Sequence, residues 1–141
     1  MPYETTWSER GVHWRYWGEV TAAETRVADA EFYGDPRADH ALFQLIDLRE
    51  VTRLDFSPHD QELTAAIDGA ASISTPAVRV AFIVPDERFD EALRIYLERI
   101  NQTTWSARTF TDPQAAQDWC ERCGEDPFTE RRRFSLRGSG V

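Results

Sequence analysis

Apolar and polar side chains alternate near the start of the chain. Along residues 12–20 the apolar side chains fall on one face and the others on the opposite face: Val12, Trp14, Tyr16 and Val20 against His13, Arg15, Trp17 and Glu19. This period of two indicates a strand. The preceding "ERG" supplies a turn in which Gly11 can adopt a positive φ angle. The pattern therefore predicts an N-terminal β-hairpin.

Four segments have helical features. Residues 21–34 open with Thr21 and Glu24 at capping-box spacing and end at Gly34. Ser57 and Pro58 begin a second helix, and Asp112 and Pro113 begin the last one, which runs to Gly124. A helix within residues 86–102 carries an apolar stripe made of Phe89, Leu93, Tyr96, Leu97 and Ile100.

The apolar residues of these helices predict which faces are buried. In the helix that starts at Pro58, we expect the inner face to consist of Leu63, Ile67, Ala70 and Ala71. In the first helix, the residues that share a face are Ala23, Val27 and Ala30.

The strands and helices alternate along the chain. Nearly continuous apolar runs at residues 40–48 and 78–84 are typical of strands buried on both faces. The first of these strands continues after a bend through residues 51–56, and a short strand is predicted at 105–110. Such alternation predicts a parallel sheet with right-handed crossovers. We therefore expect a single α/β domain with a mixed, mostly parallel β-sheet, an N-terminal β-hairpin and about four helices. The domain covers residues 1–123.

Residues 124–141 differ from this domain. They are basic and without periodicity, and they form a tail that is either solvated or docked through Phe128, Phe134 and Leu136. The chain as a whole has 141 residues and a formal net charge of −9, which disfavours nucleic acid as a partner. No apolar run is long enough to span a membrane, and no signal peptide is recognisable. A cytoplasmic location is expected.

The order of these elements resembles the STAS domain, and most closely its SpoIIAA-like branch, which is related to the CRAL-TRIO lipid-carrier fold. The resemblance covers about residues 10 to 122 and rests on four features in sequence: Trp17-Gly18-Glu19-Val20, Asp47 closing a long strand, "VAFIVPDERFDEALRIY", and Phe110-Thr111-Asp112 with Ala115, Ala116 and Trp119. It implies a SpoIIAA-like fold. Suggestions for this branch centre on the binding of apolar ligands.

One turn departs from the phosphorylated STAS proteins. There the turn reads D-S-S-G and the first serine is the kinase target, whereas here it reads Asp55-Phe56-Ser57-Pro58. Ser57 is therefore predicted to be a helix N-cap. A regulated serine, or a nucleophile with His59 as its base, are the alternatives.

Three carboxylates follow predicted strands. Because ligands bind at the carboxyl ends of parallel strands, Asp47, Asp55 and Asp86 are candidates for a ligand or partner site, together with Ser57. Their alternative role is to cap helices and end strands. Trp17, opposite the buried face of its strand, is a candidate for a dimer contact or the mouth of a pocket.

The two cysteines form a C-x-x-C at the end of the last helix. The helix dipole there opposes thiolate formation, so Cys120 and Cys123 are predicted to pack in the core rather than to act as a redox pair or a zinc site.

No cofactor, metal or catalytic set is expected from this sequence. The first hypothesis is a non-enzymatic binding or regulatory module that acts through protein–protein contacts, with a homodimer preferred. The alternative is a carrier or sensor of a small apolar ligand, held between the sheet and the apolar, alanine-rich faces of helices 57–69 and 86–97. An enzyme that uses the strand-end carboxylates ranks last.

Overall fold

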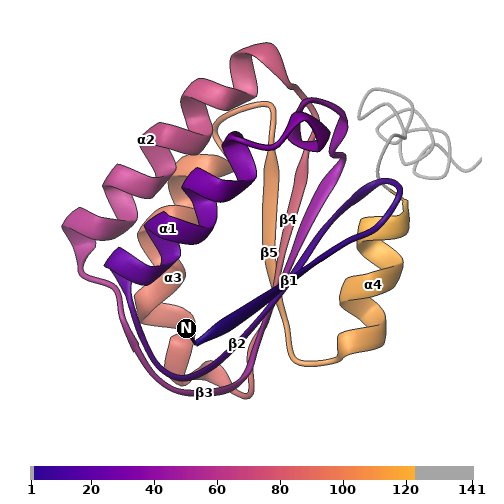
Figure 1. Ribbon diagram of the computed structural model, residues 1–141. Coiled ribbons are helices and arrows are strands. Elements are labelled where there is room, and N and C mark those ends of the chain that lie inside the picture. Colours follow the sequence, from indigo (N-terminus) through magenta and orange to yellow (C-terminus); the bar gives the residue numbers. More distant parts are fainter. Residues whose placement is uncertain (1, 123–141) are drawn as a thin grey trace, which may run out of the picture.

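A computed structural model describes residues 2–122, which form a five-stranded sheet with helices on both faces (Figure 1). The strands are β1 (Tyr3–Trp7), β2 (Gly11–Thr21), β3 (Phe43–Asp55), β4 (Arg79–Ile83) and β5 (Ser106–Phe110). The helices are α1 (Ala22–Tyr33), α2 (Pro58–Ser74), α3 (Asp90–Ile100) and α4 (Pro113–Glu121). Two short 3₁₀ turns, η1 (Pro36–His40) and η2 (Glu87–Phe89), precede β3 and α3.

The sheet follows the order of the chain, β1-β2-β3-β4-β5. Strands β1 and β2 are antiparallel and the remaining pairs are parallel, so the predicted mixed sheet is confirmed. Each parallel strand is added on the same side of the previous one, and such crossovers are right-handed. Helices α1, α2 and α3 therefore all lie on one face of the sheet, and α4 lies on the other (Figure 1).

Two clusters of buried apolar side chains fill the space between the sheet and its helices, one on each face of the sheet. The larger lies under α1–α3 and includes Val12, Trp14, Phe32, Phe82 and Tyr96. In the smaller, Trp119 and Cys120 of α4 pack against Phe43, Leu45, Ala81 and Ile83. Burial of Cys120 in the core is confirmed. The predictions for Cys123 and for the tail at 124–141 lie outside the described residues.

The predicted hairpin is confirmed, but the role given to Gly11 is wrong. The glycine with a positive φ angle is Gly18, at +69°, where the β2–β3 pairing becomes irregular. At Gly11 the constraint is space, because a Cβ atom there would lie 2.6 Å from the carbonyl oxygen of Phe43. The glycine therefore permits a close approach of β2 to the start of β3.

The predicted helix caps are present. Ser57 Oγ accepts a hydrogen bond from the Asp60 N–H at 3.1 Å, and the Asp60 carboxylate accepts one from the Ser57 N–H at 3.1 Å. Thr21 and Glu24 form the same reciprocal box at α1. Asp112 caps α4, with Pro113 in the first turn. Ser57 is thus confirmed as an N-cap, and its hydroxyl is engaged.

The predicted inner face of α2 is wrong. Its buried residues are Gln61, Thr64, Ala65, Asp68 and Ser72, whereas Leu63 and Ile67 are 39% and 41% exposed. Ala70 is also exposed, and Ala71 alone of the predicted set packs partly against the core. On α1, likewise, the predicted set of Ala23, Val27 and Ala30 faces solvent, and Ala22, Ala28 and Phe32 are buried.

The polar face of α2 is buried because the interior supplies hydrogen-bond partners. The Gln61 amide bridges one turn of α3, accepting from the Ile95 N–H at 2.9 Å and donating to the Glu91 carbonyl at 3.4 Å. Buried polar groups that are paired in this way cost little free energy. In residues 2–122, each helix is too short or too polar to cross a lipid bilayer.

Candidate functional site

A small cavity of about 60 Å³ lies between the sheet and helices α1–α3. Its apolar walls are formed by Trp14, Ile46, Leu48, Leu54, Phe82 and Leu93. Its polar groups are Tyr16, Asp29, Gln44, Thr64, Asp68 and Tyr96. These residues come from β2, β3, β4 and the three helices of this face, so the cavity exists only in the folded chain.

Asp68 is the best-held polar group of the cavity. Its side chain belongs to a residue that is only 3% exposed. Tyr33 of α1 donates a hydrogen bond to Oδ1 at 2.6 Å, and Tyr96 of α3 donates one to Oδ2 at 2.7 Å. Both carboxyl oxygens therefore accept short, charge-assisted hydrogen bonds, and Asp68 joins α2 to both neighbouring helices.

Asp29 of α1 faces the same cavity without such support. The structure gives its carboxyl group no hydrogen bond or ion pair with any of residues 2–122, although the residue is partly buried. Burial, followed by repulsion from the Asp68 carboxylate, raises the pKa of Asp29 well above its ordinary value. Burial also raises the pKa of Asp68, although the hydrogen bonds from Tyr33 and Tyr96 oppose this rise.

The two carboxyl groups thus differ in their surroundings. Burial raises the pKa of Tyr33 and of Tyr96, so both tyrosines stay protonated and donate to Asp68. These donors stabilise a negative charge on Asp68 and oppose the rise of its pKa, whereas Asp29 has no such donor.

Two further polar side chains lie on the cavity wall. The Thr64 hydroxyl is buried and makes no hydrogen bond within the described residues; Thr64 is only 8% exposed. Gln44 is 3% exposed and lines the same cavity. Thr64 therefore contributes a buried, unpaired polar atom to a wall that it shares with the Asp29 carboxyl group and the Gln44 amide.

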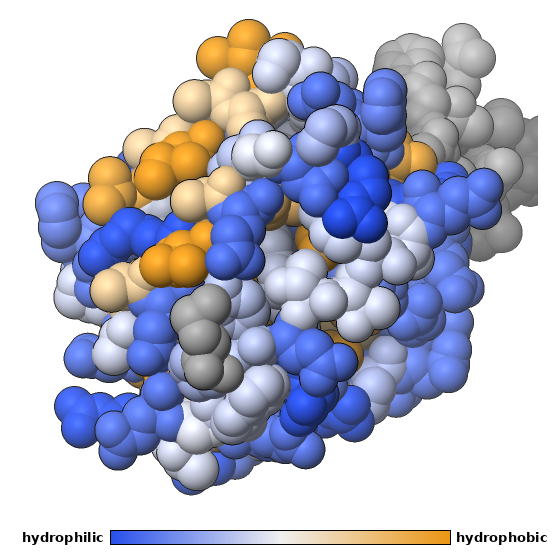
Figure 2. All heavy atoms as spheres, in the orientation of Figure 1, coloured by the Kyte–Doolittle hydropathy of each residue, from blue (hydrophilic) through white to orange (hydrophobic). Residues whose placement is uncertain are grey.

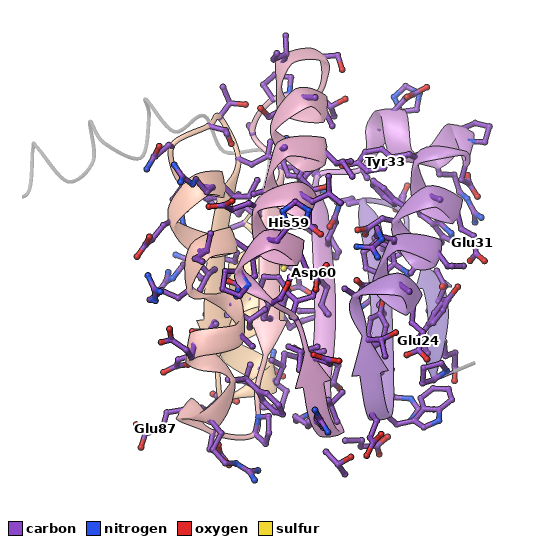
Figure 3. The ribbon with its side chains drawn as sticks, turned by 90° about the vertical axis from the view of Figure 1, so that its left-hand side faces the viewer. Glu24, Glu31, Tyr33, His59, Asp60 and Glu87 are labelled. Atoms are coloured by element: carbon purple, nitrogen blue, oxygen red, sulfur yellow. The ribbon has the colours of Figure 1, made fainter. Side chains whose placement is uncertain are left out.

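Helices α1 and α2, which both line the cavity, run side by side on this face of the sheet (Figure 3). Two side-chain hydrogen bonds join them within residues 2–122. Arg26 pairs with Asp60 at 3.4 Å near the start of α2, and Tyr33 reaches Asp68 further along. Helix α2 packs closely on α3. Between α1 and α2, in contrast, the hydrogen bonds found within residues 2–122 are these two side-chain bridges.

The site residues predicted from the sequence lie elsewhere. Asp47 is on the opposite face of the sheet, in a surface groove of about 260 Å³ beside α4. Its carboxylate accepts three hydrogen bonds from Arg49, which lower its pKa although burial opposes this. Trp17 is partly buried and lies under the Arg15 guanidinium, 4.7 Å from the ring centre.

The other predicted carboxylates do not converge with Asp47. Asp55 ends β3 eight residues beyond Asp47, a separation of about 26 Å in an extended strand. Asp86 caps η2, and its hydrogen bonds from Arg88 lower its pKa. Ser57 is exposed at the start of α2. Among residues 2–122, no three potential metal-ligating side chains gather at one point.

The polar residues of the cavity are not among the site residues predicted from the sequence. Their helical spacing nevertheless marks them as one side of each helix. Asp60, Thr64, Asp68 and Ser72 recur every four residues along α2. Asp29 and Tyr33 have the same spacing on α1. Each row defines one side of a helix, but apolar rows on the other sides of both helices predict the opposite burial.

The chain thus has an α/β fold in which a five-stranded mixed sheet carries α1–α3 on one face and α4 on the other. A solved structure from Shewanella loihica PV-4, described as an uncharacterised protein of the DUF3478 family with a SpoIIAA-like fold, is similar to this chain with a TM-score of 0.51. The similarity covers 84% of this chain and 91% of the other, at 20% sequence identity. At this identity it shows the fold, and the resemblance inferred from the sequence is confirmed at that level. No protein-family model and no curated protein matches the chain.

Proposed function

We propose that the chain is a non-enzymatic binding module that takes a small molecule into the cavity between the sheet and α1–α3. The observation that carries the proposal is the buried Thr64 hydroxyl, which has no hydrogen-bond partner within residues 2–122 and shares the cavity wall with the Asp29 carboxyl group and the Gln44 amide. A buried polar group without a partner costs about 1–3 kcal/mol. A folded protein that keeps such a group on a cavity wall beside other polar side chains fits a site whose hydrogen bonds are completed by a ligand.

The size and lining of the cavity limit the ligand. One buried water needs a cavity volume of roughly 10–15 Å³. A cavity of about 60 Å³ therefore holds around five waters, or about five non-hydrogen atoms of a ligand. A long acyl chain does not fit this space. The apolar, alanine-rich lining predicted for the helices is also wrong, because α2 contributes Thr64 and Asp68. A small ligand with polar groups therefore replaces the lipid-like ligand that the sequence suggests.

The surroundings of the strand-end carboxylates support binding rather than catalysis. Asp47 and Asp86 are each held by an adjacent arginine, and Asp47 and Asp55 are too far apart to act as an acid–base pair. In the cavity, both oxygens of Asp68 are engaged by tyrosines. An ionised Asp68 held in this way is better suited to fix a charge than to exchange a proton.

Thr64→Val is expected to stabilise the free protein by about 1 kcal/mol, because it replaces an unsatisfied hydroxyl with a methyl group of the same size. The same change is expected to weaken ligand binding. Stability is measured by urea unfolding. Binding is measured by NMR of the full chain with methyl-labelled Ile and Leu, titrated with butylamine, butanol, butyramide and butyrate.

Signals of Ile46 and Leu93 should move with at least one of these probes, and more weakly in Thr64→Val. Thr104→Val is the matched control, because the Thr104 hydroxyl donates to the Ser72 carbonyl at 3.0 Å and should therefore cost stability when lost. If no probe moves the cavity signals, the proposed function is wrong.

A second candidate function, contact with a second copy of the chain, is favoured by the outer face of α2. Leu63, Ile67 and Ile73 are 39%, 41% and 86% exposed there, and apolar residues gather over α2 at the upper left of Figure 2. The residues Leu63, Ala66, Ala70 and Ile73 have the 3-4-3 spacing of helices that pair with a similar helix. A symmetric α2–α2 contact would bury the same stripe on both copies.

Replacing both Leu63 and Ile73 with glutamine is expected to convert a dimer into a monomer without loss of stability, because both side chains are exposed in the single chain. Sedimentation equilibrium at about 100 µM measures the mass of each variant. Arg53→Gln, an exposed change on β3, is the control and should leave the dimer intact. A monomeric parent chain at this concentration would exclude the contact.

A further inference from the structure

We propose that the ligand of this cavity is a small organic cation, a primary ammonium group on a short apolar body. The inference rests on the proposed function and specifies the ligand class. The ligand class is inferred from the polar side chains on the cavity wall, because a bound ligand must match their hydrogen-bonding character.

An ammonium group suits the polar groups on the cavity wall. It carries three N–H donors and no acceptor. The Asp29 carboxyl, the Gln44 amide and the Thr64 hydroxyl each offer an acceptor oxygen, and the Thr64 hydroxyl is buried without a partner in residues 2–122. These groups stand on α1, β3 and α2, which surround the cavity from three sides.

The charges around the cavity favour a cation. Two carboxyl groups line it, and no arginine or histidine is found among its lining residues. The nearby Arg26 of α1 is directed to Asp60 at the start of α2, so its charge is already engaged. An anionic ligand would be repelled by the Asp68 carboxylate, with no cationic side chain among the lining residues to offset the repulsion.

The walls suit both parts of such a ligand. Trp14, Tyr16, Phe56, Phe82 and Tyr96 line the cavity, and aromatic rings attract cations through their negative faces. Ile46, Leu48 and Leu93 provide an apolar surface for the carbon atoms. With room for about five non-hydrogen atoms, the site matches an amine of four carbons.

The pH dependence of binding follows from the groups that face Asp29. These are Asp68 on α2, Tyr16 on β2, Tyr33 on α1 and Tyr96 on α3, while β3 and β4 contribute no titratable side chain to the cavity lining. The tyrosines stay neutral because burial raises the pKa of each. An ammonium ligand favours the ionised form of Asp29, so its affinity should rise with pH through the pKa of Asp29.

The test compares probes of equal size and different charge on the full chain. Butylamine, butanol and butyrate are titrated at pH 8 and pH 5.5, with binding read from the Ile46 and Leu93 methyl signals. At pH 8 butylamine should bind at least tenfold tighter than butanol, and butyrate should not bind. At pH 5.5 the preference for butylamine should shrink severalfold.

Two variants assign the effect. Asp29→Asn should weaken butylamine at least tenfold and leave butanol unchanged, and its fold is not at risk because the change removes an unpaired acid. Asp39→Asn, an exposed change on η1, should alter neither affinity and thus controls for net charge.

The two proposals fail in different ways. Equal or tighter binding of butanol or butyrate overturns the cation and leaves the binding function standing. Movement of the cavity signals by none of the probes means that the cavity holds water alone, and overturns both.

Discussion

Asp68→Ala is expected to lower the free energy of unfolding at pH 7 by about 3 kcal/mol, the largest effect that we predict for a single substitution. The change removes the acceptor for the hydroxyls of Tyr33 and Tyr96. A hydrogen bond to a charged group contributes roughly 1.5–3 kcal/mol, and a buried hydroxyl left unpaired adds a further cost. The regained hydration of one carboxylate offsets only part of this loss. Helices α1 and α3 would both lose a tie to α2.

Urea unfolding of the parent chain and a small set of variants measures this effect. Asp68→Asn keeps one acceptor oxygen and should lose about half as much stability. Tyr96→Phe removes one donor but leaves Asp68 paired with Tyr33, and should cost about 1.5 kcal/mol. A loss below 1 kcal/mol for Asp68→Ala would show that the buried carboxylate does not hold the helices together.

Asp29→Asn is expected to have the opposite sign and to stabilise the protein by about 1–2 kcal/mol at pH 8. Burial and the neighbouring Asp68 raise the pKa of Asp29 in the folded state. A group of this kind binds its proton more tightly when folded, so its contribution to stability is present at low pH and is lost as pH rises through its folded pKa. Near pH 4, where an unfolded aspartate titrates, the parent and the variant should therefore differ little.

The matched comparison is Asp35→Asn at the start of η1. Hydrogen bonds from Arg37 lower the pKa of Asp35 to about 2. The contribution of Asp35 is therefore present above pH 4 and is lost as pH falls towards 2. Its removal should destabilise the protein at pH 8, whereas removal of Asp29 should stabilise it. Urea unfolding at pH 4, 6 and 8 separates the two, and an Asp29→Asn variant less stable than the parent at pH 8 would contradict the unpaired acid.

A stabilising substitution at Asp29 would also bear on function. Residues that reduce stability are retained where a site needs them, because binding sites are built from groups that are unsatisfied until the ligand arrives. The expected pattern is therefore opposite for the two acids. Asp68 supports the fold and the site together, while Asp29 weakens the free fold and strengthens binding.

The sequence by itself determined the order of the strands and helices, the mixed sheet and the caps at Thr21, Ser57 and Asp112. These features depend on neighbouring residues. The caps join positions two or three apart, and the strand period of Val12 to Val20 follows from the alternation of side chains along an extended chain. Phe56 likewise distinguishes this turn from that of the phosphorylated STAS proteins, because its side chain has no hydroxyl to phosphorylate.

Only the tertiary structure decided which side of α2 is buried and which side chains line the cavity. The spacing of residues gives a helix two faces, and Leu63 with Ile67 marked one of them as clearly as Thr64 with Asp68 marked the other. The choice depends on partners that are distant in the sequence: Tyr33 of α1, and Ile95 and Tyr96 of α3, which form hydrogen bonds with Gln61 and Asp68 of the polar face. Asp29 and Asp68 meet for the same reason, because right-handed crossovers place α1 and α2 on one face of the sheet, a consequence of the whole chain that no local pattern records.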